Sequence, residues 1–487
     1  MIAAAIPFRG LNLWALWQVE VAEKFAAWQG SGDDELMRIA FTNGGGVLPT
    51  IPRFVATFFD DPLLGVRATA LCAVAAVVAS VFVLVASRVG RRAATLAVVA
   101  LCLTPRFWAA ATVPSATIFA TAAVLLVWVT ALAARDDWRW APVSLFAMTL
   151  GLGTHPVVWL FLIPLAWVAL VKPGSIGGGM VSIRSVGLWI LVLPVLAVML
   201  LVIGNEYYHE DTALRLGEAL SLWLERPTEP FLYAGARMGH ARLLPHVPIK
   251  LLAITIPAGL VVAAMGGAFA LRGLSPSSRH DLWAFGSFAL LAAFLLRSPY
   301  FGGADLLLLG AVFVAMLAGI GLDFAYRALV SRFGDGIAAV LIASVFLLSA
   351  ADVARCGMNF ESYYSGAIGG TSGAVQRGYS RYAHAPVPVA ELRSLNQSGV
   401  NKLAIMTNGW EMRPVIERYR DLGVVGPEFE LVELMEAQAI VVHFDDSLPE
   451  LYSVIRDVGL FAAGSPESTL VVGSPEMPLF LFGRISH

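Results

Sequence analysis

The sequence predicts a mainly α-helical membrane protein, in which a polytopic bundle of about 10–11 transmembrane helices precedes a small extracytoplasmic α/β domain. Of the 487 residues, 58% are hydrophobic and 14% are charged, whereas soluble domains carry about 25% charged residues. Long apolar segments follow one another as far as residue 351, and alternating strand and helix patterns begin near residue 401. We therefore expect domains at 1–350 and 351–487.

The expected spans are the apolar segments long enough to cross a bilayer, which takes roughly 17–25 residues. Residues 141–171 are apolar but are interrupted around Gly153, His155 and Pro156, which predicts two short helices meeting at a break. Residues 1–28 are a weaker candidate because charged residues interrupt them. The other candidates are 66–87, 93–111, 115–134, 185–204, 249–271, 281–297, 304–323 and 336–351.

Basic residues in the connecting loops predict the orientation, because cytoplasmic loops carry an excess of Lys and Arg. If 141–171 forms two spans, all the basic loops fall on one side, which we assign to the cytoplasm. The acidic residues 33–35, the loop 205–248 and everything after 351 then lie on the opposite side. The basic loops contain Arg88, Arg91 and Arg92; Arg135 and Arg139; Lys172 and Arg184; Arg272 and Arg279; and Arg327 and Arg332.

Charge and motifs exclude several functions. The formal net charge of −2 offers no basic face for nucleic acid. Cys72 and Cys102 lie in apolar segments and Cys356 has no obvious partner, so neither a disulfide framework nor a metal-thiolate site is expected. The sequence contains no Walker A, dinucleotide-binding, nucleophile-elbow or zincin motif. We expect no cofactor, and nothing in the sequence indicates a divalent metal.

A short acidic cluster, Asp33, Asp34 and Glu35, is the first candidate site. A carboxylate here could act as a general base that deprotonates an acceptor hydroxyl or amine. The same residues also suit the start of a helix near Leu36, since Asp favours helix N-caps.

The loop 205–248 is the second candidate site, because it combines arginines, carboxylates and aromatic rings. Arginine binds phosphate oxygens, and carboxylates and rings suit a sugar. Its spacing of His209, Glu210 and Asp211 matches no zinc pattern. A plain solvated loop remains an alternative. The residues of interest are Arg226, Tyr233, Arg237 and Arg242.

His155 is a third candidate, because a His inside a membrane segment is costly unless it faces the protein interior or a wet cavity. A packing or capping role is an equal alternative. After residue 401, strands are expected at 402–406, 439–443, 470–472 and 479–482, with helices at 413–422 and 448–458.

The order of these features resembles the C-type-fold glycosyltransferases that use lipid-linked sugars, a group that includes protein O-mannosyltransferases and aminoarabinose transferases of lipid A. Asp34 and Glu35 match the acidic pair in the first extracytoplasmic loop of that group. Similar stretches are DDPLLGVRATALCAV at 60–74, FAMTLGLGTHPVVWLFLIPLAWVAL at 146–170, EPFLYAGARMGHARLLPHVPIKLLAITIPAGL at 229–260, SPYFGGADLLLLGAVFVAMLAGIGL at 298–322 and NFESYYSGAIGGTSGA at 359–374.

The resemblance implies a bacterial inner-membrane enzyme that moves a sugar from a polyprenyl-phosphate carrier to an extracytoplasmic protein, lipid or glycan. It implies Asp34 as the base, with Glu35 and Asp33 as supporting site carboxylates. Arg226, Arg237 and Arg242 would bind the carrier phosphate, and His155 and Tyr233 would line the cavity. Membrane lipid is the second expected partner.

Three departures from the group favour an alternative, a catalytically inactive relative that serves as an accessory subunit of a membrane complex. Ser115 stands where the group often has a carboxylate. Residues 300–305 lack the Arg and His of a YDGLRH-like loop, and residues 379–382 lack the acidic residue of a DYW-like stretch. A transporter is a third reading, but it would require paired discontinuous helices, and the sequence indicates a single break.

Overall fold

The structure is a computed structural model of the 487-residue chain. Most of the helical bundle and the strands that follow it are described. The described residues are 58, 62–112, 116–152, 157–158, 161–162, 165, 195–199, 214, 231–233, 236–238, 246–295, 307–355, 363–370, 373–374, 377, 379, 395–397, 399–406, 420, 423, 425–433, 439–443, 471–472 and 480–484.

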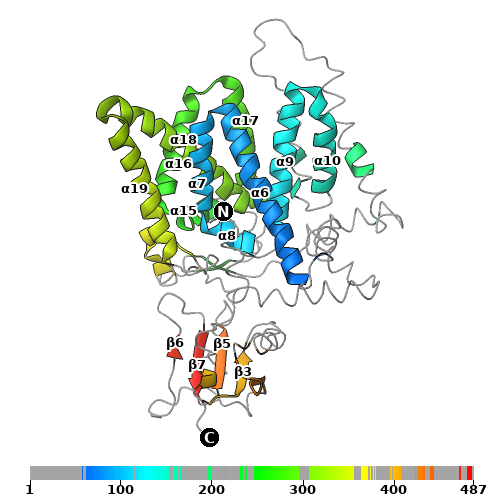
Figure 1. Ribbon diagram of the computed structural model, residues 1–487, viewed down its shortest axis with the longest axis vertical. Coiled ribbons are helices and arrows are strands. Elements are labelled where there is room, and N and C mark those ends of the chain that lie inside the picture. The colour runs from blue at the N-terminus through cyan, green and yellow to red at the C-terminus, as the bar shows by residue number, and fades with distance from the viewer. Residues whose placement is uncertain are drawn as a thin grey trace, which may run out of the picture.

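Helices make up the larger part of the described chain (Figure 1). The α-helices are α6 (Pro62–Arg88), α7 (Arg91–Cys102), α8 (Pro105–Thr112), α9 (Ala116–Asp136), α10 (Ala141–Leu152), α15 (His246–Ile254), α16 (Ala258–Ala270), α17 (Pro276–Leu295), α18 (Leu307–Phe333) and α19 (Asp335–Ala354). Short 3-10 helices lie at Trp138–Trp140, Leu271–Gly273 and Gly366–Ile368.

Four of these helices are long and apolar enough to cross a membrane: parts of α6 and α9, and all of α18 and α19. The count within the described residues becomes five if α7 and α8 form one broken span. The expectation of a polytopic helical membrane protein is thus confirmed. The expected spans 66–87, 115–134, 304–323 and 336–351 each fall on one of these four helices, and 281–297 falls largely on α17.

Two expected spans, 93–111 and 249–271, are wrong as single helices. The first divides into α7 and α8, which are bent by 69°, and the second divides into α15 and α16. Proline explains both breaks. Pro105 begins α8 and Pro257 directly precedes α16, and proline is favoured at a helix start but disrupts a helix interior. Side chains bond the carbonyls freed at the first break: Thr104 Oγ1 donates to Ala100 O at 3.0 Å, and Trp108 Nε1 donates to Cys102 O at 2.6 Å.

Helix α18 is the centre of the bundle. Its side chains from Leu307 to Asp323 are buried, except that of Val314, which is half-buried. Glycines let its neighbours come close, as small residues do in membrane bundles. A Cβ atom at Gly267 of α16 would collide with the Leu317 carbonyl, and one at Gly321 of α18 would collide with the Ala263 carbonyl. Backbone contact therefore fixes how α16 packs on α18.

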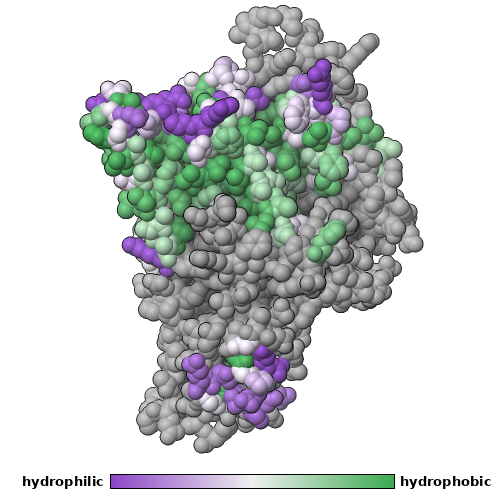
Figure 2. Space-filling view, viewed as in Figure 1, coloured by the Kyte–Doolittle hydropathy of each residue, from purple (hydrophilic) through white to green (hydrophobic). Residues whose placement is uncertain are grey.

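The turns that carry arginine lie at one end of the bundle. Figure 1 places the turns after α6, α9, α16 and α18 together at its upper end. In Figure 2 hydrophilic residues follow this end and hydrophobic residues lie below them. Four of the five basic loops thus share one side, as expected; the fifth, with Lys172 and Arg184, falls outside the described residues.

The C-terminal strands form a mixed five-stranded sheet in the order β4-β3-β5-β7-β6. β3 (Lys402–Met406) pairs in parallel with β4 (Glu430–Leu431) and β5 (Ala439–His443), and β7 (Phe480–Arg484) pairs antiparallel with β5 and β6 (Val471–Val472). The expected strands at 402–406 and 439–443 are confirmed, and those at 470–472 and 479–482 overlap β6 and β7. The two-residue strand β4 was not expected, and the expected helices at 413–422 and 448–458 fall outside the described residues.

Candidate functional site

Most of the site residues expected from the sequence lie outside the described residues. These are Asp33, Asp34, Glu35, His155, Arg226 and Arg242. Arg237 is described by its backbone, in β2 (Ala236–Met238), and Tyr233 is described in full, at the end of β1 (Phe231–Tyr233). The two strands form an antiparallel hairpin in which Leu232 pairs with Arg237 and Tyr233 pairs with Ala236. This pairing brings the backbones of Tyr233 and Arg237 close together.

Tyr233 belongs to a cluster of aromatic rings around one lysine, which we call the tyrosine–lysine cluster: Tyr233, Lys250, Tyr364 and Tyr379. The Tyr233 and Tyr379 rings meet edge to face at 5.6 Å between centroids, and the Tyr364 and Tyr379 rings are 6.2 Å apart. The Lys250 ammonium lies 5.0 Å from the Tyr233 ring centroid and 5.4 Å from that of Tyr379. These residues come from the β1–β2 hairpin, from α15 and from the chain after α19.

Helix α15 supplies the cationic side of this cluster. His246 and Lys250 are four residues apart and therefore lie on one face of the helix. Both are exposed, and the His246 ring is 5.9 Å from the Tyr233 ring. In Figure 1 α15 lies toward the end of the bundle opposite the arginine-bearing turns. The cluster therefore belongs to the side of the bundle that the sequence assigns to the extracytoplasmic space.

Hydrogen bonds fasten the chain after α19 to the ends of two helices. The Asp352 carboxylate of α19 accepts a bond from the Tyr363 hydroxyl at 2.6 Å and from the Gly366 N–H at 3.0 Å. The Ser365 N–H donates to the carbonyl of Ile254, the last residue of α15, at 2.8 Å. These bonds place Tyr364, which is fully buried, beside Tyr379.

The electrostatics of the cluster suit an anion. Burial raises the pKa of the Tyr233 hydroxyl, although Lys250 partly opposes this, so the phenol is neutral at neutral pH. The groups described around the Lys250 ammonium are phenols rather than carboxylates. The exposed Lys250 side chain can bind the oxygens of a phosphate, because hydrogen bonds between charged partners are the strong ones.

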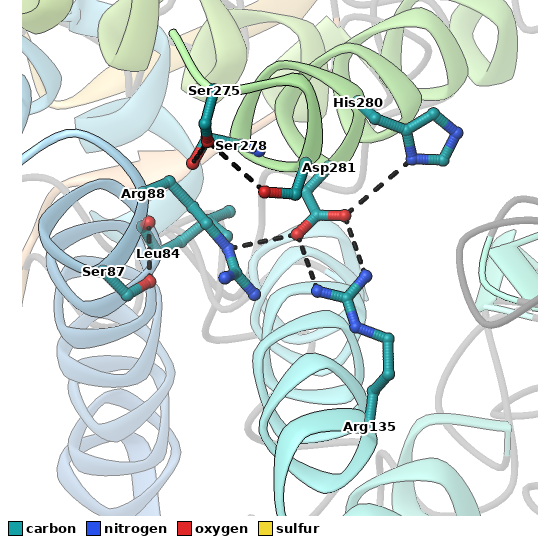
Figure 3. A network of polar contacts seen from close by, with 9 residues as sticks. Leu84, Ser87, Arg88, Arg135, Ser275, Ser278, His280 and Asp281 are labelled. Atoms are coloured by element: carbon teal, nitrogen blue, oxygen red, sulfur yellow. Dashed lines mark hydrogen bonds and ion pairs between the residues drawn. The ribbon is translucent and has the colours of Figure 1, made fainter. Parts of the chain in front are cut away.

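A second polar network lies at the opposite, arginine-bearing end (Figure 3). The fully buried carboxylate of Asp281 in α17 receives both Nη groups of Arg135 at 3.0 Å, and the Nε of Arg88 lies 3.1 Å away. The Nδ1 atom of His280 is 3.9 Å from the same carboxylate. Asp281 thereby joins the ends of α6, α9 and α17.

Asp323 has a similar place on α18, where Arg92 of α7 and Arg327 of α18 both donate to its carboxylate. Two buried aspartates therefore hold four of the arginines of the basic loops. All the described partners of these two carboxylates belong to the helical bundle itself, which indicates that the contacts have a structural role. Among the described residues, no group of three or more His, Cys, Asp or Glu side chains could hold a metal ion.

Sequence reasoning missed Lys250, Tyr364, Tyr379 and Asp281. Lys250 had a usable signal, because it stands four residues after His246, a spacing that places two cationic groups on one face of a helix. Tyr364 and Tyr379 lie in stretches that the family resemblance singled out, but nothing in the sequence placed them beside α15, because more than a hundred residues separate them from that helix.

A bundle of membrane helices followed by a small mixed sheet is the architecture that the sequence predicts, and comparison with solved structures supports the fold of C-type glycosyltransferases. No protein-family model and no curated protein matches the sequence.

The structure of this chain is similar to that of ArnT from Cupriavidus metallidurans, solved bound to undecaprenyl phosphate. The match covers 99% of this chain and 96% of that one, with a TM-score of 0.52 and 13% identity. The apo state of the same ArnT matches with a TM-score of 0.46, 12% identity and coverage of 91% and 87%. The archaeal oligosaccharyltransferase AglB from Archaeoglobus fulgidus, in complex with an inhibitory peptide and a dolichol-phosphate, matches with a TM-score of 0.43, 10% identity and coverage of 82% and 61%.

Proposed function

We propose that this protein is a membrane glycosyltransferase that moves a sugar from a polyprenyl-phosphate carrier to an extracytoplasmic acceptor. The observation that carries the proposal is the tyrosine–lysine cluster, a cation beside two buried phenols at the end of the bundle away from the arginine-bearing turns. The fold supports it, because ArnT, of similar fold, was solved bound to undecaprenyl phosphate. A donor that dissolves in lipid also explains why a transferase should be built as a membrane bundle.

In this proposal Lys250 binds the phosphate of the carrier, and Tyr233 and Tyr379 hold the lysine in place. The acceptor hydroxyl or amine attacks the anomeric carbon of the sugar. The bond between that carbon and the phosphate oxygen breaks, and the carrier phosphate leaves with the electron pair. Asp34 takes the proton from the acceptor, since a positioned carboxylate can act as general base.

The other site residues keep the roles that the sequence resemblance implies. Glu35 and Asp33 support Asp34, and His155 lines the cavity. The remaining phosphate ligands are Arg226, Arg237 and Arg242. We propose an inner-membrane location, with residues 351–487 as an extracytoplasmic domain. The acceptor is a protein, a lipid or a glycan.

Binding of undecaprenyl phosphate to the purified full-length protein tests the proposal, with undecaprenol as the uncharged probe and native mass spectrometry as the readout. Lys250→Gln should weaken binding of undecaprenyl phosphate by roughly 10–100-fold, since a hydrogen bond to a charged group contributes about 1.5–3 kcal/mol. Binding of undecaprenol should not change. The matched control is Lys402→Gln in β3, a half-exposed lysine paired with Glu430 at 4.0 Å. Equal affinity of wild type and Lys250→Gln for the phosphate would refute the proposal.

An accessory subunit without activity is the second candidate, favoured by Ser115 at a position where the resembling group often has a carboxylate. The two functions predict different results for Asp34→Asn in cells. A transferase loses its product and its phenotype with this change, whereas an accessory subunit keeps the phenotype as long as the variant is present at normal amounts in the membrane.

A further inference from the structure

Arg106 is a buried cation in the helical bundle. It lies in the first turn of α8, is 9% exposed, and its Nε donates a hydrogen bond to Thr255 Oγ1 at 2.7 Å. Thr255 is fully buried and directly follows α15. An arginine buried in a membrane bundle is costly, and such residues are usually retained for a function.

The Arg106–Thr255 bond joins the two helix breaks. Arg106 stands just after the 69° bend between α7 and α8, and Thr255 stands in the break between α15 and α16. The Thr255 hydroxyl in turn donates to the carbonyl of Leu251 at 2.5 Å. The bond from Arg106 therefore acts on the last turn of α15, where a cation is also favoured by the helix dipole.

Helix α15 depends on such anchors for its position. It has nine residues, and helices this short are marginal without tertiary contacts. Its last residue, Ile254, also accepts the bond from Ser365, next to Tyr364 of the tyrosine–lysine cluster. Lys250 lies in the same helix, five residues before Thr255. Arg106 thus acts on the C-terminal end of the same short helix that carries Lys250.

We infer that Arg106 is a positioning residue, which fixes α15 through Thr255 and so holds Lys250 where it binds the phosphate of a lipid-linked donor. This inference rests on the proposed function. A hydrophobic side chain of similar volume could fill the same space at no greater cost in stability, because burying a charge is unfavourable. What arginine adds is a directional hydrogen bond between the two helix breaks.

The experiment changes the acceptor of the bond and leaves Arg106 in place, because variants of a buried arginine can fail to fold. Thr255→Val removes the hydroxyl while keeping the shape, and Thr255→Ser keeps the hydroxyl. Affinities for undecaprenyl phosphate and undecaprenol are measured on the full chain in detergent, together with the melting temperature. Lys250→Gln is measured in parallel.

Thr255→Val should weaken binding of undecaprenyl phosphate by up to about 10-fold, because losing one internal hydrogen bond to a charged group can change the affinity by no more than the contribution of that bond. Undecaprenol binding should not change, and Thr255→Ser should bind the phosphate within about 2-fold of wild type, because it retains that bond. The inference is overturned if Thr255→Val binds the phosphate normally, if it loses both lipids equally, or if Thr255→Ser fails to restore binding. In those cases, weaker binding of undecaprenyl phosphate by Lys250→Gln still supports the proposed function. Normal binding of undecaprenyl phosphate by Lys250→Gln refutes that function itself.

Discussion

Single residues differ in how far the sequence reveals them. Tyr233 was expected at a site, and it lies in the tyrosine–lysine cluster. Asp281 was not expected, because its importance depends on Arg88 and Arg135, which belong to other helices and reach it only in the folded bundle. Sequence patterns reveal local chemistry, and a buried ion pair between distant segments has no local pattern.

At this scale we predict that Asp281→Asn destabilises the bundle. The change would leave two guanidinium groups, each 15% exposed, without their anion. Breaking a buried pair costs about 3–5 kcal/mol, and the partial exposure of the arginines places this variant at or below the lower end of that range. Unfolding in detergent, followed by circular dichroism, measures the free energy.

Asp137→Asn is the matched control. Asp137 is exposed and accepts one bond, from the Arg139 N–H at 3.0 Å. Its loss should cost less than about 1 kcal/mol, as is usual for exposed charges. Equal stability of Asp281→Asn and wild type would contradict the structural role of the Asp281 network.

Elements were predicted better than their breaks. The long spans in α6, α9, α18 and α19 follow from continuous apolar runs, which need little else to be recognised. The two spans predicted as single helices contain Pro105 and Pro257, so the signal for each break was present in the sequence. The prediction of single helices rested on the hydrophobicity of these segments. A proline inside a segment is, however, stronger evidence for a helix break than apolar composition is for a continuous helix.

At the scale of elements we predict that Gly321→Ala forces α16 and α18 apart. Its Cβ atom would collide with the Ala263 carbonyl, which is backbone and cannot rotate away. Overpacking of this kind costs about 1–3 kcal/mol, and the melting temperature of the purified protein should fall accordingly.

Gly336→Ala is the control in this case, because a Cβ atom there meets nothing within 4 Å. Gly336 lies in α19, and alanine in a helix is more stable than glycine by roughly 0.5–1 kcal/mol. The opposite order of the two variants would show that α16 and α18 do not make this backbone contact.

At the scale of the whole molecule, the orientation derives from the arginine-bearing turns, which the sequence grouped on one side and the structure brings to one end (Figure 1). The tyrosine–lysine cluster could not be predicted from the sequence, because it forms only where the hairpin at Tyr233, helix α15 and Tyr379 meet in the folded protein. Contacts between segments so far apart in the sequence depend on how the helices pack and not on any local periodicity.

We predict that the turn at Gly273 and the exposed residue Glu428 lie on opposite sides of the membrane. Single cysteines at these positions, in a chain without Cys72, Cys102 and Cys356, can be labelled with a membrane-impermeant maleimide. Both positions are exposed. In intact spheroplasts Glu428→Cys should react and Gly273→Cys should react only after the membrane is opened. The reverse pattern would invert the topology and move the tyrosine–lysine cluster to the cytoplasmic side.

A cryo-electron microscopy structure of the full-length protein with added undecaprenyl phosphate would show whether a lipid-linked phosphate binds at Lys250. We predict density for the phosphate within hydrogen-bonding distance of the Lys250 ammonium, beside Tyr233 and Tyr379. A carrier headgroup bound elsewhere, or a Lys250 whose surroundings are filled by side chains with the lipid absent, would exclude Lys250 as a ligand of the carrier phosphate.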